Sequence, residues 1–149
     1  MWGNVMAGGG GIEWYLKNNG AGHAYDLAVE NLREFDAHWK QTGHLGRFFR
    51  EIVQEQKDVN LQNLEPANGL SSNGSDWVLA DEGRAYIIFL REGGSPSLTL
   101  PGNGSYIVQW FNPRSGKLFN RASVSGSGSK SLGSAPEQTG QDWVILVSK

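Results

Sequence analysis

Apolar residues recur at helical spacing in the first half of the chain. Between Asp26 and about Gln56 they stand three to four positions apart, which predicts one long amphipathic helix. Asp26 suits the N-cap, because its carboxylate can accept hydrogen bonds from the free amides of the first turn. Gly43 is a position where the helix could bend or stop. The apolar face consists of Leu32, Phe35, Trp39, Leu45, Phe48, Phe49, Ile52 and Val53.

A short buried strand is expected before this helix. The run Gly8–Gly11 leads into Ile12–Leu16, which is rich in β-branched and aromatic residues. A strand, a loop and a helix form one βα unit, and such a unit cannot bury both faces of its strand alone. Because the glycines precede the strand, they favour a tight backbone approach over a phosphate-binding loop.

The hydrophobic period changes after Pro66. Residues 68–75 are polar and predict a linker or boundary loop. Beyond them a period of two recurs in six short segments, separated by turn residues at a spacing typical of β-sandwiches. The expected strands are Trp77–Ala80, Ala85–Leu90, Ser97–Leu100, Tyr106–Phe111, Leu118–Ser123 and Trp143–Val147.

Turn signals support this assignment. Asp81-Glu82-Gly83 and Asn112-Pro113-Arg114-Ser115-Gly116 each end in a glycine that can take a positive φ, and the second predicts a hairpin. The glycine- and serine-rich segment Ser125–Ser134 is expected to be a flexible hairpin loop. The sequence therefore predicts an α+β fold, in which an N-terminal strand and a long helix (residues 1–67) precede an antiparallel β-sandwich (residues 76–149).

Composition narrows the classes of partner. The 13 basic and 15 acidic side chains give a formal net charge of -2, so neither nucleic acid nor an anionic membrane surface is an expected partner. No apolar run approaches the roughly 20 residues that span a bilayer, and no export signal is expected at the first residues. The chain has no cysteine, which excludes disulfides and thiolate metal sites but does not decide its compartment.

Candidate catalytic groups are few. The three histidines lack metal-ligand spacing, and no serine stands in a G-x-S-x-G elbow. Glycoside hydrolysis uses two facing carboxylates, whereas Glu13 is the single carboxylate on the candidate N-terminal strand. We therefore predict no catalytic residue, no metal and no cofactor for this chain, and retain Glu13 as a candidate ligand-binding residue.

Three tryptophans are candidate ligand platforms. Trp77, Trp110 and Trp143 lie on expected strands, where an aromatic ring can either stack on a ligand or fill the core. Two Asn-Gly-Ser triplets, at Asn73 and Asn103, match the glycosylation acceptor, which has meaning only in a eukaryotic secretory pathway.

Several segments resemble a known family. Met6–Tyr15, Asp26-Leu27, Glu30-Asn31 and Phe48-Phe49 resemble the last βα unit of the barrel in apiosidase-like (DUF4038) glycoside-hydrolase-type proteins. The second half resembles the β-domain that follows this barrel, catalogued as a collagen-binding domain of a collagenase. The segments that carry this second resemblance are Ala85–Leu90, Gly93-Gly94, Val108–Gly116 and Asp142–Leu146.

The resemblance implies a remnant of a TIM barrel followed by a non-catalytic C-terminal accessory domain. The barrel domain of the parent is then the expected partner, and the parent is expected to be a secreted or periplasmic glycoside hydrolase. A polysaccharide or collagen is a further expected partner. Two other roles stay open: Glu13 and the loop 17–25 contribute to the substrate cleft of an intact hydrolase, or the sandwich serves packing alone. Because the apolar helix face needs a cover, we expect it to dock on the sandwich or on a second copy as a homo-oligomer.

Overall fold

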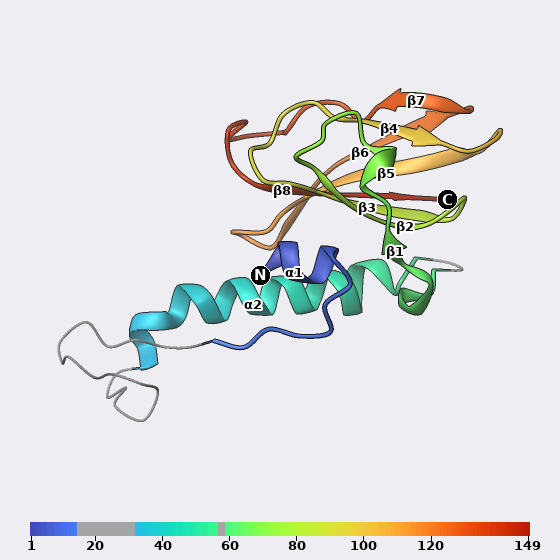
Figure 1. Cartoon of the computed structure of the whole chain (residues 1–149). Helices are drawn as coiled ribbons and strands as arrows, with labels where there is room; N and C mark the ends of the chain where they lie inside the picture. Colours follow the sequence, from blue (N-terminus) through green and yellow to red (C-terminus); the bar gives the residue numbers. More distant parts are fainter. Residues whose placement is uncertain (15–31, 57–58) are drawn as a thin grey trace.

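The computed structural model describes residues 1–14, 32–56 and 59–149, and these form three layers. Figure 1 shows a small sheet, a large sheet and a layer of helices stacked on one another. The large sheet is antiparallel with the order β1-β2-β3-β8-β5-β6, and the small sheet pairs β4 with β7. The strands are β1 (Glu65–Pro66), β2 (Trp77–Asp81), β3 (Ala85–Leu90), β4 (Ser97–Leu100), β5 (Ser105–Asn112), β6 (Lys117–Ser125), β7 (Gly128–Ser131) and β8 (Trp143–Ser148).

The predicted long helix is confirmed over the residues that are described. A 3₁₀ turn η2 (Leu32–Phe35) leads into α2 (Asp36–Arg47), which continues as a π-helical turn η3 (Phe48–Val53). Gly43 lies inside α2 and does not interrupt it. The proposed N-cap Asp26 lies outside the described residues. The remaining helices are α1 (Trp2–Met6), η4 (Leu61–Asn63) and η5 (Asn68–Leu70).

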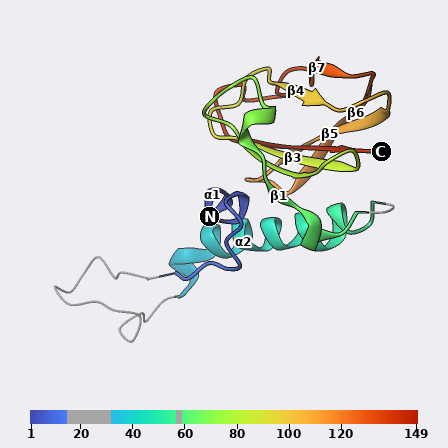
Figure 2. The same cartoon turned by 45° about the vertical axis from the view of Figure 1, so that its right-hand side comes forward.

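The expected strand before the helix does not form in its described part. Residues 12–14 have no regular secondary structure, and residues 15 and 16 lie outside the described residues. A strand needs a neighbour for its backbone groups, and no described strand runs beside this segment. The segment instead lies along α2 (Figures 1 and 2). There the Trp14 Nε1 donates to Thr42 Oγ1 at 3.2 Å, and the Trp14 ring meets the His38 ring edge-on.

The six predicted strands of the second half are confirmed, and so is the α+β class. β3 and β8 lie in the middle of the large sheet, and all six residues of β8 are buried. Both faces of these two strands are covered, by the small sheet on one side and by helices on the other. This explains why their sequences are nearly continuous apolar runs rather than strict alternations.

Part of the expected flexible loop at Ser125–Ser134 is a strand. β7 pairs with β4 in an antiparallel register that sets Leu98 opposite Lys130 and Leu100 opposite Gly128. Both leucines of β4 point into the core, so the backbone of β4 needs a hydrogen-bonding partner there. Glycine and serine have low strand propensity, and the sequence therefore gave no strand signal for β7.

The polar segment 68–75 is hydrogen-bonded to both sheets. The Asn68 side chain accepts from the Val78 amide at 2.8 Å, and the Ser72 amide donates to the Ser97 carbonyl at 3.0 Å. An isolated bridge joins Ser71 to Leu98. The segment is thus a fastened connection, and the division of the chain into two domains at this place stays a prediction.

Candidate functional site

The helix docks on the large sheet through an apolar interface. Of the two expected arrangements, docking on the sandwich or on a second copy, the structure shows the first. One buried cluster joins residues of α1 and η3 to the face of the large sheet that points away from the small sheet. Burial of each large side chain there is worth about 1.5–3 kcal/mol. The buried members are Trp2, Met6, Phe48, Ile52, Val53, Leu79, Ile87, Phe111, Val144 and Leu146.

Trp2 lies at the centre of this interface. Its ring stacks on Phe89 with centroids 5.9 Å apart and meets Phe48 edge-on at 5.4 Å. Phe49 and Phe111 lie at 6.0 Å and 6.2 Å from the same ring. The side chain is 4% exposed, and its Nε1 has no hydrogen-bond partner among the described residues. Trp2 therefore acts as a packing residue that joins the short helix α1 to helix and sheet at once.

A polar junction fixes the helix to the β5–β6 turn. The Arg47 guanidinium donates to the Gly116 carbonyl at 2.7 Å, and His44 Nδ1 lies 3.2 Å from the Pro113 carbonyl oxygen. Gly116 has φ +71°, and a Cβ at this position would lie 2.7 Å from the His44 ring. The turn must therefore be closed by glycine, both for its backbone conformation and for the close approach of the helix.

The other side of the same turn is fixed to the start of β8. Arg114 donates to the carboxylate and to the backbone carbonyl of Asp142, and its second amino group donates to Gln138 at 3.0 Å. Its guanidinium carbon lies 5.6 Å from the centroid of the Trp143 ring, a cation–π arrangement. The Asn112 side chain accepts from the amides of Arg114 and Ser115. The side chains of Asn112 and Arg114 thus hold the turn in place within the fold.

The four predicted ligand-binding residues occupy different environments. Trp110 and Trp143 lie in the core between the two sheets with 2% and 0% exposure, so neither ring offers a face to an external ligand. Trp77 is 38% exposed, and its ring lies against Gly3 of α1. Glu13 is exposed and has no hydrogen bond or ion pair within the described part of the chain. The structure does not bring these four residues together.

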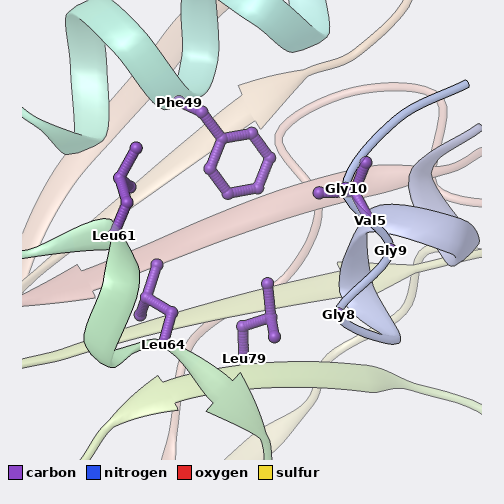
Figure 3. A pocket seen from close by; sticks show the side chains of 8 residues that line it. All are labelled: Val5, Gly8, Gly9, Gly10, Phe49, Leu61, Leu64 and Leu79. Carbon is purple, nitrogen blue, oxygen red and sulfur yellow. The ribbon is translucent and has the colours of Figure 1, made fainter.

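An apolar pocket of about 450 Å³ opens at the end of the helix–sheet interface (Figure 3). The glycines of the predicted tight backbone approach form one wall, and apolar side chains of η3, η4 and β2 form the others. Gly9 does approach closely, since a Cβ there would lie 2.7 Å from the Asn4 carbonyl oxygen. The lining residues are Val5, Gly8, Gly9, Gly10, Phe49, Leu61, Leu64 and Leu79.

Neither a metal cluster nor a membrane helix is found within residues 1–14, 32–56 and 59–149. In these ranges no three histidine or carboxylate side chains gather as metal ligands would. The helices in the same ranges lack the length and apolar character needed to cross a bilayer.

These observations define the class: an antiparallel β-sandwich with a helix packed on the face of its large sheet that points away from the small sheet. Residues 80–148 match the family model described as "Putative collagen-binding domain of a collagenase". This match confirms the resemblance predicted for the second half. No curated relative matches the chain in sequence.

Eight chains of solved structures share the fold. One, titled "Glycoside hydrolase", is 14% identical with a TM-score of 0.63 over 89% of this chain. Another, a glycoside hydrolase family 5 protein from Bacteroides vulgatus ATCC 8482, is 11% identical with a TM-score of 0.58 over 76% of this chain. The present chain spans only 30% and 24% of their lengths. At these identities the likeness shows a shared fold.

The polar junction was not predicted from the sequence as a site. The turn signal at Asn112–Gly116 was evident, but nothing in the spacing indicated that Arg47 would reach the Gly116 carbonyl, because the two are 69 residues apart. The turn and the Asp142-Trp143 pair both lie in segments that resemble the same family. This was the one signal in the sequence that could have suggested a contact between them.

Proposed function

We propose that this chain is a non-catalytic accessory domain of a longer glycoside-hydrolase-like protein and packs on a barrel through the first part of its long helix. The observation that carries the proposal is the unequal burial along this helix. η3 is buried in the sheet through Phe48, Ile52 and Val53, whereas no residue of α2 is buried. The comparisons support it, since the fold recurs as less than a third of glycoside hydrolase chains.

Two large apolar side chains lie on the part of the helix that the sandwich does not cover. Phe35 is half-buried and Trp39 is 39% exposed, and because they stand four residues apart they lie on the same face of the helix. Large apolar side chains in an exposed row mark a contact surface more often than a free one. A neighbouring domain that covers this row would bury it as the sheet buries η3.

The size of the natural polypeptide tests the proposal directly. An antiserum raised against this chain should detect in the source cells a protein much larger than 16.3 kDa. Detection of the 16.3 kDa chain alone would overturn the proposal.

A substitution tests the surface. Trp39→Glu should leave the thermal midpoint of this chain nearly unchanged, because the side chain is not part of its core. The same substitution in the longer protein should loosen the contact between the domains and speed proteolysis between them. If Trp39→Glu did not speed proteolysis between the domains of the longer protein, Trp39 would not lie in the contact between them.

Binding of a polymer is a second candidate function, favoured by the partly exposed ring of Trp77. Such rings stack on sugars and on proline-rich rods, although one ring forms only a small platform. Titration with polysaccharides and with triple-helical collagen peptides should give a saturable fluorescence shift that Trp77→Ala abolishes. If no polymer changed the fluorescence, the polymer-binding role would be excluded and the packing role would remain. The role of Glu13 in a hydrolase cleft is less favoured, because a second facing carboxylate is required for that chemistry.

A further inference from the structure

The chain carries Asn-Gly pairs whose side chains differ in how they are held. Three of them lie in the described residues, at Asn68, Asn73 and Asn103. In such a pair the backbone nitrogen of the glycine can attack the asparagine side chain, because glycine has no Cβ to obstruct the approach. Which pair reacts depends on how freely the asparagine amide can turn toward this nitrogen.

Hydrogen bonds hold two of the three amides. Asn68 Oδ1 accepts from the Val78 amide at 2.8 Å. Asn73 Nδ2 donates to the Asp76 carboxylate at 3.1 Å, and its Oδ1 accepts from the amide and the hydroxyl of Ser75 at 3.2 Å and 3.0 Å. Rotation of either side chain toward attack would break these bonds.

Asn103 is held by none. It is exposed and lies in the bend that joins β4 to β5, directly after Gly102, whose φ is +58°. Within the part of the chain that the structure describes, its side chain has no hydrogen-bond partner. The bend therefore combines a free amide with a glycine on either side.

We propose that Asn103 is a site of spontaneous deamidation in the folded protein. The Gly104 nitrogen attacks Asn103 Cγ and loses its proton, a C–N bond forms, and Nδ2 leaves as ammonia. Water then opens the resulting succinimide ring and leaves either aspartate or isoaspartate. The step needs no oxidant, reductant or enzyme.

The product changes a packed part of the molecule. A Cβ on Gly104 would lie 3.0 Å from the Tyr106 ring and 3.3 Å from Lys149 Cε, so little free space surrounds this backbone. Isoaspartate adds a methylene group to the main chain here, and both products add a negative charge to a chain of formal net charge -2. The start of β5 must therefore shift when isoaspartate forms.

The experiment follows all three pairs in the same sample. The native chain and the chain unfolded in urea are incubated at neutral pH and digested, and the peptides are quantified by mass spectrometry and by isoaspartyl methyltransferase labelling. In the native chain we expect Asn68 and Asn73 to react about tenfold or more slowly than Asn103, because their hydrogen bonds must break first. In urea the three should react at similar rates. Asn103→Gln, an exposed substitution, should remove the product at position 103 and leave the slower reactions at Asn68 and Asn73 unchanged.

Two outcomes would overturn the proposal. In the first, Asn68 or Asn73 reacts as fast as Asn103 in the native chain, so the hydrogen bonds do not discriminate. In the second, Asn103 reacts in urea but not in the native chain, so the folded bend withholds the amide from attack.

Discussion

At the scale of the residue, Arg114 connects more of the molecule than its place in a hairpin turn suggests. Its guanidinium holds Asp142, Gln138 and the ring of Trp143, and thereby joins the β5–β6 turn to the start of β8. The Arg114 and Asp142 side chains are 24% and 31% exposed, so solvent screens their attraction less than that of surface pairs.

Arg114→Met should therefore lower the free energy of unfolding by about 1–3 kcal/mol, measured by urea denaturation. The matched control is Arg91→Met, which removes an ion pair whose partners are 74% and 75% exposed and should hardly change stability. Equal effects of the two substitutions would show that Arg114 is only another surface cation.

Asp76 is a carboxylate with 2% exposure at the entrance to β2. Burial raises the pKa of Asp76 above its ordinary value, and the hydrogen bond from Ser71 opposes this effect. A raised folded-state pKa means that the contribution to stability is present below the unfolded-state pKa and is lost as the pH rises through the folded-state pKa.

The chain should therefore gain stability relative to Asp76→Asn when the pH falls from neutral toward about 4. The asparagine can keep both contacts, since its amide donates to Ser71 Oγ and its carbonyl accepts from Asn73. Urea denaturation of both proteins across this range measures the difference. A difference that does not vary with pH would contradict the assignment.

At the scale of the element, the contact between the β5–β6 turn and the helix depends on one missing Cβ. Gly116→Ala should destabilise through its positive φ, at about 1–2 kcal/mol, and through collision with the His44 ring. Gly83→Ala isolates the first effect, because Gly83 has φ +81° but open space around its Cβ position.

Thermal melting of Gly116→Ala and Gly83→Ala measures how much more stability the first substitution loses than the second. This excess belongs to the helix contact. His44→Ala combined with Gly116→Ala should recover this excess, because the ring is gone. If Gly116→Ala costs no more than Gly83→Ala, the helix does not press on the turn in solution.

The elements that could be predicted were those whose own residues carry the signal. β3 and β8 are apolar runs bounded by turns, and α2 with η3 has helical spacing, so each was evident without knowledge of its neighbours. β7 and the coil at residues 12–14 were not, because their structure depends on other segments. β7 is a strand because β4 lies beside it and pairs with its backbone. Residues 12–14 have no such neighbour among the described strands, and they form no strand.

At the scale of the whole molecule, the sequence predicted the components but not how they are joined. The apolar stripe showed that the helix must be covered, yet periodicity cannot say whether a sheet, a barrel or a second copy covers it. The same limit applied to the tryptophans. Trp77 and Trp110 both stand on strands, but only the layer order shows that one reaches the surface and the other faces the small sheet.

The layer order also decides which parts should unfold together. β3 and β8 contribute residues to two buried clusters, one on each face of the large sheet. One is the core between the two sheets, and the other packs against Phe48, Ile52 and Val53 of η3. Loss of η3 would remove much of the cover from one face of these central strands, on which α1 also packs. We therefore expect the helix end and the sandwich to form one cooperative unit, and the first part of α2 to be more weakly held.

Native-state hydrogen exchange tests this claim most directly. The account predicts that amides of η3 exchange with the same opening free energy as those of β3 and β8. Amides in the first turns of α2 should exchange with a lower opening free energy. Exchange of η3 at a much lower opening free energy, with β3 and β8 still protected, would show a detachable helix and contradict the account.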